Sequence, residues 1–231
     1  MHKIADKLTQ VKHRIQQVAR LSGRNPDEIT LLAVSKKHPA AAIADAYAAG
    51  QADFGENYLQ EALDKMDTLA DLAITWHFIG PIQSNKVKKI AQHFAWVHSV
   101  DNLKTAQKLS KHRPEDRAPL QYCIQVNIDN EASKAGVLPE NLDELVKSVR
   151  NLPNITLRGL MAIPEKGTSK DDENNAFARL RQLLNELQIK RGKHFPELNT
   201  LSMGMSADMD DAVWEGATIL RIGTDIFGPR P

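Results

Sequence analysis

A lysine at the end of an apolar run is the residue best placed to do chemistry. Lys36 ends the run of residues 29–36 and is followed by Lys37, His38 and Pro39. A short run rich in branched side chains is typical of a buried strand of a parallel sheet that leads into a loop. Withdrawal from water lowers the pKa of a lysine and supplies the neutral amine that forms an imine with an aldehyde. The alternative is a lysine that packs its stem and keeps its charged head in water.

A second group of polar residues, near the other end of the sequence, suits a phosphate monoester. Gly223 lets the backbone approach an anion closely, and Thr224 adds a hydroxyl. Ser206 precedes a predicted helix, so it either binds phosphate or serves as a plain helix N-cap. Arg221 stands two residues before Gly223, so both face the same side of a strand. By itself such an arginine is typical of a phosphate clamp or a salt-bridge partner.

A regular alternation of elements could bring these residues together. Short apolar runs predict strands at residues 30–36, 53–57, 75–80, 96–100, 121–128, 158–163, 200–203 and 218–222. Apolar residues three or four apart predict helices at 4–21, 40–49, 59–69, 85–92, 103–111, 142–149, 174–188 and 208–215. The order predicts an α/β protein, a single (β/α)8 TIM barrel with an extra N-terminal helix, in which one domain spans residues 1–231.

The main competing fold is an open, doubly wound sheet. That fold usually carries a glycine-rich phosphate loop after its first strand, where this chain has Lys37, His38 and Pro39. In a barrel, by contrast, the carboxyl ends of all strands face one mouth, where active sites are built. We therefore expect Lys36, Asn57 and the segments at 202–206 and 221–224 to converge there, with phosphate bound after the last two strands.

Composition limits the classes of function. The chain has 231 residues, 42% hydrophobic and 26% charged, which is typical of a globular protein. Its net charge of +1 argues against nucleic acid or a membrane as partner. One cysteine, Cys123, and the lack of an evident signal peptide or membrane span lead us to expect a cytoplasmic protein. The eight histidines show no metal-ligand spacing, and no catalytic residue can be assigned from order alone.

Six blocks of sequence resemble the YggS/PROSC family, the pyridoxal phosphate homeostasis proteins. The resemblance covers nearly the whole chain, and it implies the barrel of alanine racemase standing alone, without the C-terminal domain of the racemase. The blocks are AVSK at 33–36, FGENY at 54–58, WHFIGPIQSNK at 76–86, GLMAI at 159–163, LSMGMS at 201–206 and RIGT at 221–224.

The resemblance also implies roles for single residues. Lys36 would form the internal aldimine with the cofactor, pyridoxal 5'-phosphate, and Arg221 would face its pyridine nitrogen. The phosphate would be held by Ser206, Gly223 and Thr224. An arginine only donates hydrogen bonds, so it leaves the ring nitrogen unprotonated and the ring a weak electron sink. Asn57 could reach the ring oxygen, or it could be an amide satisfied within the strand end.

At three positions the chain departs from the family. Ala135 stands where serine is more frequent, and Lys37 where a small polar residue is common. Asp225 follows the expected phosphate loop where a small apolar residue is usual, so a carboxylate there would weaken phosphate binding unless it points away.

The expected function is vitamin B6 homeostasis, in which the chain holds pyridoxal phosphate without robust catalysis. We expect a monomer, with apo-enzymes that use the cofactor as candidate partners. One alternative is an amino-acid racemase, which needs a second proton-transfer group that Tyr47, Tyr58 and Tyr122 do not obviously supply. Another is an aldolase-like barrel in which Lys36 attacks a sugar phosphate.

Overall fold

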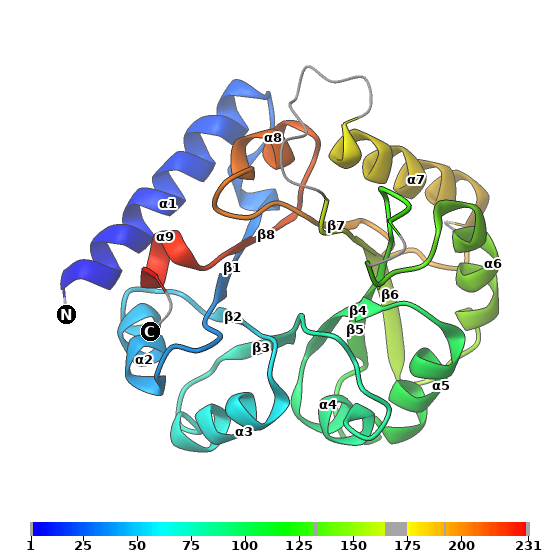
Figure 1. Cartoon of the computed structure of the whole chain (residues 1–231), viewed down its shortest axis with the longest axis horizontal. Coiled ribbons are helices and arrows are strands. Elements are labelled where there is room, and N and C mark those ends of the chain that lie inside the picture. The colour runs from blue at the N-terminus through cyan, green and yellow to red at the C-terminus, as the bar shows by residue number, and fades with distance from the viewer. Residues whose placement is uncertain (1, 132–133, 165–174, 192, 230–231) are drawn as a thin grey trace.

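The structure is a computed structural model that describes residues 2–131, 134–164, 175–191 and 193–229. Its centre is a closed barrel of parallel strands in the order β1 to β8, with helices around the outside (Figure 1). The strands are β1 (Thr30–Val34), β2 (Asp53–Glu56), β3 (Thr75–Phe78), β4 (Trp96–Val100), β5 (Leu120–Gln125), β6 (Ile155–Met161), β7 (Thr200–Ser202) and β8 (Ile219–Ile222).

Apart from α1, which precedes β1, one α-helix follows each strand in chain order, as a parallel barrel requires. They are α1 (His2–Leu21), α2 (Ala40–Ala48), α3 (Leu59–Thr68), α4 (Val87–His93), α5 (Leu103–His112), α6 (Pro139–Val149), α7 (Ala176–Arg191), α8 (Met209–Trp214) and α9 (Thr224–Phe227), and a short 3-10 helix, η1 (Pro26–Glu28), precedes β1.

The barrel closes where β8 pairs with β1. Thr30 lies opposite Ile219, and Ala33 lies opposite Ile222. Closure confirms the predicted (β/α)8 barrel and contradicts the open, doubly wound sheet. It also brings the loop after β1, which carries Lys36, beside the loop after β8, which carries Gly223.

The N-terminal helix predicted from its apolar stripe is present. Leu8, Val11 and Ile15 of α1 are buried because their spacing puts them on one face. In Figure 1, α1 lies along α8 and α9 on the outside of the barrel, and it contacts both. It therefore covers the outside of the barrel near the join between β8 and β1.

Element boundaries differ from the sequence prediction at strand ends. The first strand ends at Val34, so Lys36 lies in a turn, in which Lys37 takes a left-handed φ of 66°. The fifth strand ends at Gln125 rather than at residue 128, and the sixth begins at Ile155. The one-turn helix α9 was not predicted, because four residues are too few to show helical periodicity.

Candidate functional site

A cavity of about 230 Å³ opens at the carboxyl ends of the strands. All six residues predicted from sequence line it, although they come from segments up to 188 positions apart (224 minus 36). They are Lys36, Asn57, Ser206, Arg221, Gly223 and Thr224. The barrel thus brings the predicted amine, cation, amide and hydroxyls to one place, as its topology requires.

The loop that carries Lys36 is held by its own backbone. The N–H of Ser35 donates to the carbonyl of Gly55 (3.1 Å), and the N–H of His38 donates back to the carbonyl of Ser35 (3.0 Å). The N–H of Lys37 donates to Oε1 of Glu61 (2.6 Å). Lys36 itself is half-buried, while Lys37 is exposed. The two neighbouring lysines are therefore in different environments, and only Lys36 lines the cavity.

Four residues form a charged cluster behind this loop, which we call the Lys65 brace: Ser35, Glu56, Glu61 and Lys65. Nζ of Lys65 donates to Oε1 of Glu56 (2.7 Å), to Oε1 of Glu61 (2.6 Å) and to the carbonyl of Ser35 (2.9 Å). The hydroxyl of Ser35 donates to Oε1 of Glu56 (2.7 Å). Burial raises the pKa of Glu56 despite the opposing effect of Lys65. The brace ties the backbone next to Lys36 to β2 and α3.

Asn57 stands where two strand ends come unusually close. A side-chain carbon on Gly80 would lie 2.2 Å from the carbonyl oxygen of Asn57, so only glycine fits there. Oδ1 of Asn57 is buried and has no hydrogen-bond partner among the described residues. This contradicts the alternative of an amide satisfied within the strand end. A buried oxygen without a donor beside a cavity marks a position where a ligand could supply one.

Arg221 is buried inside the barrel mouth, with 5% of its surface exposed. Nη1 donates to the carbonyl of Ser202 (2.5 Å) and to its hydroxyl oxygen (3.0 Å), and Nη2 donates to the carbonyl of Ala162 (2.8 Å). These hydrogen bonds use at most three of the five N–H groups of the guanidinium, so at least two N–H groups remain that could donate to a ligand. Burial lowers the pKa of Arg221 to about 10, which leaves it protonated at neutral pH.

The predicted phosphate segment lies at the junction of β8 and α9. Gly223 precedes α9 and passes close to β1: a side-chain carbon on it would lie 3.2 Å from the carbonyl oxygen of Val34. Thr224 begins α9. Among the residues that the structure describes, Asp225 is not one that lines the cavity. The extra carboxylate noted in the sequence therefore lies off the cavity wall.

Ser206 does not cap a helix, contrary to the alternative weighed from sequence. Helix α8 begins at Met209 with Asp208 at its N-cap position, and Ser206 lies in the turn before it. The carboxylate of Asp208 accepts a hydrogen bond from the N–H of Met205 (2.6 Å). Asp208 thus fixes this turn, while Ser206 lines the cavity.

Sequence reasoning missed several lining residues, of which His38 is the most notable. It is 8% exposed, and its ring stacks on that of Phe227 at 5.1 Å between centroids. Its place two residues after Lys36 was the available signal. Its stacking partner could not be anticipated, because Phe227 belongs to the unpredicted helix α9. Of the other lining residues, Ile163 ends the sixth predicted strand and Met205 lies in the segment 202–206, so both were expected at the mouth, whereas Val34, Ile79, Ala207 and Gly228 were missed.

A second cavity, of about 260 Å³, adjoins the first and shares Asn57, Ile79 and Ile163 with it. Its outer wall includes Lys134 and Ala135, from the loop that follows β5. Because Ala135 stands where serine is more frequent in the family, one wall of this cavity is less polar than it would be with serine.

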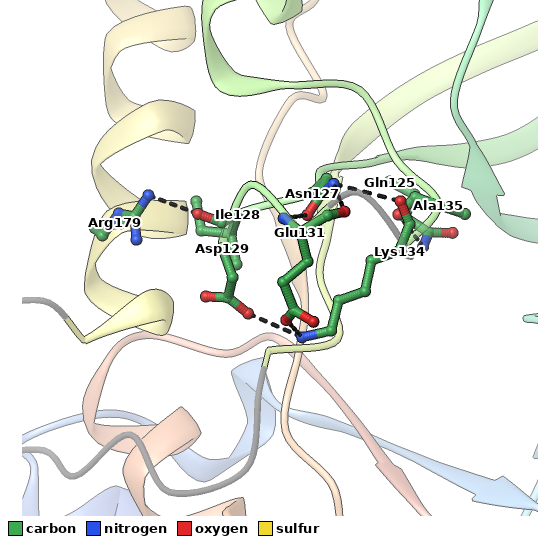
Figure 2. Close-up of polar contacts among 8 residues, drawn as sticks. All are labelled: Gln125, Asn127, Ile128, Asp129, Glu131, Lys134, Ala135 and Arg179. Carbon is green, nitrogen blue, oxygen red and sulfur yellow. Dashed lines mark hydrogen bonds and ion pairs between the residues drawn. The ribbon is translucent and has the colours of Figure 1, made fainter.

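Internal hydrogen bonds hold the loop after β5 in place (Figure 2). The side-chain amide of Asn127 donates to the carbonyl of Glu131 (2.8 Å), and Lys134 pairs with Asp129 (3.1 Å) and with Glu131. Arg179 of α7 donates to the carbonyl of Ile128 (2.5 Å). Residues 132 and 133 of this loop, close to Ala135, lie outside the described residues.

Other sequence predictions can be compared with the same structure. Cys123 is fully buried, as expected, and burial raises the pKa of its thiol to about 12. Within the described ranges, no group of three His, Cys, Asp or Glu side chains could hold a metal ion. None of the helices in the described part of the chain is long and apolar enough to cross a membrane.

Comparison with known proteins gives a consistent result. The sequence model of the family described as "Alanine racemase, N-terminal domain" matches residues 7–231. A protein of Pseudomonas aeruginosa named "Pyridoxal phosphate homeostasis protein" is 55% identical over all of this chain and 97% of its own length. A protein of Escherichia coli K12 with the same name is 47% identical over all of this chain and 98% of its own.

A solved structure shares the fold. PipY of Synechococcus elongatus, solved with pyridoxal phosphate bound, is 40% identical and superimposes with a TM-score of 0.82. The match covers 97% of this chain and all of that one.

Proposed function

We propose that this chain binds pyridoxal 5'-phosphate through Lys36 and serves vitamin B6 homeostasis. The chain belongs to the family of pyridoxal phosphate homeostasis proteins and carries the alanine racemase N-terminal domain. The observation that carries this proposal is the convergence of all six predicted residues on one cavity. PipY, a relative of similar fold, was solved with this cofactor bound.

The cavity residues suit the functional groups of the cofactor. When bound, pyridoxal phosphate supplies an aldehyde that reacts with a primary amine and a ring that can delocalise charge. Lys36 offers the amine, and the unpaired Oδ1 of Asn57 shows that the cavity has an unmet hydrogen-bonding group. Ser206, Gly223 and Thr224 offer hydroxyls and close backbone to a phosphate, and Arg221 offers N–H groups to the ring nitrogen.

Weak catalysis follows from the nature of Arg221. The guanidinium stays protonated at neutral pH and has no acceptor, so it stabilises an unprotonated ring nitrogen. A ring without that proton withdraws electrons poorly, and carbanion chemistry is then slow. We therefore propose a role in holding and releasing the cofactor, without robust catalysis.

The racemase alternative lacks support at the cavity wall. Two-base racemisation needs a second proton-transfer group beside the cofactor. Tyr122 is buried within β5, Tyr58 is half-exposed, and none of the three tyrosines, all in the described part of the chain, lines the cavity. This favours a cofactor-holding protein over a racemase.

The decisive experiment identifies the modified lysine. The purified protein is loaded with pyridoxal phosphate, reduced with borohydride and mapped by peptide mass spectrometry. We expect a phosphopyridoxyl group on Lys36 after reduction. In spectra taken before reduction, we expect the visible absorption band of the imine to be lost in Lys36→Ala and unchanged in the matched control Lys37→Ala. A chromophore of full strength in Lys36→Ala would overturn the assignment.

Failure of the protein to take up pyridoxal phosphate would favour another function. If the wild type takes up no pyridoxal phosphate at Lys36, a sugar phosphate trapped at the same lysine by borohydride would favour the aldolase-like alternative.

We also propose that the chain acts in the cytoplasm as a monomer and delivers the cofactor to apo-enzymes. Light scattering of the loaded protein tests the monomer. Reactivation of an apo-enzyme across a dialysis membrane, compared with direct mixing, tests whether delivery needs contact.

A further inference from the structure

A continuous chain of hydrogen bonds begins at Arg221 in the cavity wall and runs through the inside of the barrel. We call it the histidine chain: Asp53, His77, His98, Ser202 and Arg221. Oδ1 of Asp53 lies 3.1 Å from Nε2 of His77, and Nδ1 of His77 lies 2.9 Å from Nε2 of His98. Nδ1 of His98 lies 2.7 Å from the hydroxyl of Ser202, which lies 3.0 Å from Nη1 of Arg221.

The strand geometry explains why these residues meet. His77 is the third residue of β3, close to its carboxyl end, and the cavity residue Ile79 directly follows that strand. Asp53 stands at the amino end of β2, and the cavity residue Asn57 directly follows its carboxyl end. The histidine chain therefore links the cavity end of the barrel to the opposite end.

The two ends of the chain fix the direction of every hydrogen bond. Arg221 can only donate and the carboxylate of Asp53 can only accept. Ser202 thus accepts from Arg221 and gives its own proton to Nδ1 of His98. His98 then carries its proton on Nε2 and donates to Nδ1 of His77, which carries its proton on Nε2 and donates to Asp53. Each link requires its neighbour to have this orientation.

The surroundings of the chain keep both rings neutral. His98 and Ser202 are fully buried and His77 is 1% exposed. Burial lowers the pKa of both histidines, that of His98 well below its usual value, with Arg221 and His77 adding to the effect. The ring of Trp96 stacks on His77, nearly parallel at 5.5 Å between centroids. The interior thus holds a neutral path between a buried cation and a carboxylate.

We propose that Ser202, His98 and His77 are positioning residues, which hold the guanidinium of Arg221 at the angle from which it meets a ligand ring in the cavity. The inference rests on the proposed function for the nature of that ligand. It extends the proposed function because it assigns a role to residues that do not line the cavity. The Ser202 hydroxyl, whose proton is donated to His98, makes one of the three hydrogen bonds that orient the guanidinium, so loss of any link weakens that bond and leaves Arg221 held by the carbonyls of Ser202 and Ala162 alone.

The first test needs no cofactor. Two-bond ¹⁵N–¹H correlation spectra of the unloaded protein at pH 7 report which nitrogen of each histidine carries the proton. We expect the Nε2–H form for both His77 and His98. A proton on Nδ1 of either ring, or a doubly protonated ring, would overturn the directional chain, whatever the fate of the proposed function.

The second test uses the loaded protein and a matched pair of serine variants. Ser202→Ala removes the link to Arg221, whereas Ser110→Ala removes the hydroxyl of another buried serine, on α5, which donates to the carbonyl of Pro153. For Ser202→Ala we expect a shifted absorption maximum of the bound cofactor and about ten-fold weaker affinity, one hydrogen bond to a charged group being worth about that factor. Ser110→Ala should match the wild type in both.

Substitutions of His98 separate positioning from packing. His98→Asn keeps a hydrogen-bond acceptor near the position of Nδ1. His98→Leu keeps a side chain of similar volume but has no hydrogen-bond acceptor. We expect the absorption maximum to stay near that of the wild type in His98→Asn and to shift in His98→Leu. If Ser202→Ala and His98→Leu both retain the wild-type maximum and affinity while Lys36 is still modified, the positioning role is wrong and the cofactor assignment stands. If the wild type takes up no cofactor at Lys36, the proposed function and the positioning role both fail.

Discussion

The two cationic residues of the cavity wall are held by opposite means. Lys36 stands on a loop fixed by the Lys65 brace, in which buried Lys65 lies between two carboxylates. Arg221 is fixed by the histidine chain and by the carbonyls of Ser202 and Ala162, so its hydrogen-bond partners are all neutral groups. The brace acts on backbone, through the carbonyl of Ser35, whereas the histidine chain acts on a side chain.

The difference agrees with the proposed function, in which Lys36 binds the cofactor covalently and Arg221 faces its ring. A lysine that forms a covalent bond needs only a well-placed backbone, because its long side chain can adjust. An arginine that meets a planar ring needs a fixed plane, and neutral hydrogen bonds fix it without cancelling its charge. The charged brace and the neutral chain should therefore respond differently to substitution and to pH.

The largest effect should come from breaking the brace. Lys65→Met leaves Glu56, which is fully buried, without its cation, so we expect a loss of about 3–5 kcal/mol in the free energy of unfolding. Urea denaturation measures it. Arg14→Met is the control, since it breaks an ion pair with Asp210 whose side chains are 44% and 45% exposed and should cost less than about 1 kcal/mol. Equal losses in the two variants would show that the brace is not a structural element.

Acid should weaken the histidine chain next. His77 and His98 have lowered pKa values in the folded state, so below about pH 6.5 the unfolded chain binds protons that the folded chain does not. Their stabilising contribution is complete above that pH and is lost as the pH falls. The two together should cost at most about 3 kcal/mol between pH 7.5 and 5.5, measured by urea denaturation at each pH.

Two variants test which histidines cause this change of the free energy of unfolding with pH. His98→Gln should remove about half of the loss, and His13→Gln, at an exposed position of α1, should leave it unchanged. His93, whose pKa burial also lowers, contributes to the same slope and is unaltered in both variants. A wild-type stability that is flat over this range would contradict neutral burial of the two rings.

The smallest effect should come from neutralising the outer member of the brace. Glu61→Gln keeps an oxygen that can accept from the N–H of Lys37 and from Lys65, and this side chain is 28% exposed. We expect a loss of about 1 kcal/mol and unchanged modification of Lys36. A loss as large as that in Lys65→Met would mean that Glu61, not Glu56, is the main counter-charge of Lys65.

The barrel and its six cavity residues could be predicted because both depend on periodicity and order. Parallel strands place their carboxyl ends together, so a list of strand ends already contains Lys36, Asn57 and Arg221. The alternation of strand and helix gave the closed sheet for the same reason. Of the two alternatives for Ser206, the cap was wrong, because helix α8 begins later than residue 207 and Asp208 occupies its N-cap position.

The brace and the histidine chain could not be predicted. Lys65 lies in a predicted helix, and nothing in local spacing shows that it turns inward to meet Glu56. His77 and His98 are 21 residues apart and come together only because β3 and β4 are neighbours in the sheet. Polar residues inside apolar strands were the available signal, but their partners depend on tertiary contacts.

The pairing of β8 with β1 has a consequence for the order of synthesis. Lys36 leaves the ribosome 185 residues before Arg221, which at ordinary elongation rates of 5–20 residues per second is an interval of about 10–40 s. Until β8 is added, β1 is an open edge and the cavity lacks the wall formed by Gly223 and Thr224. Under the proposed function, a nascent chain therefore carries Lys36 long before it has the residues that would hold a phosphate, and the six cavity residues come together only on a finished barrel.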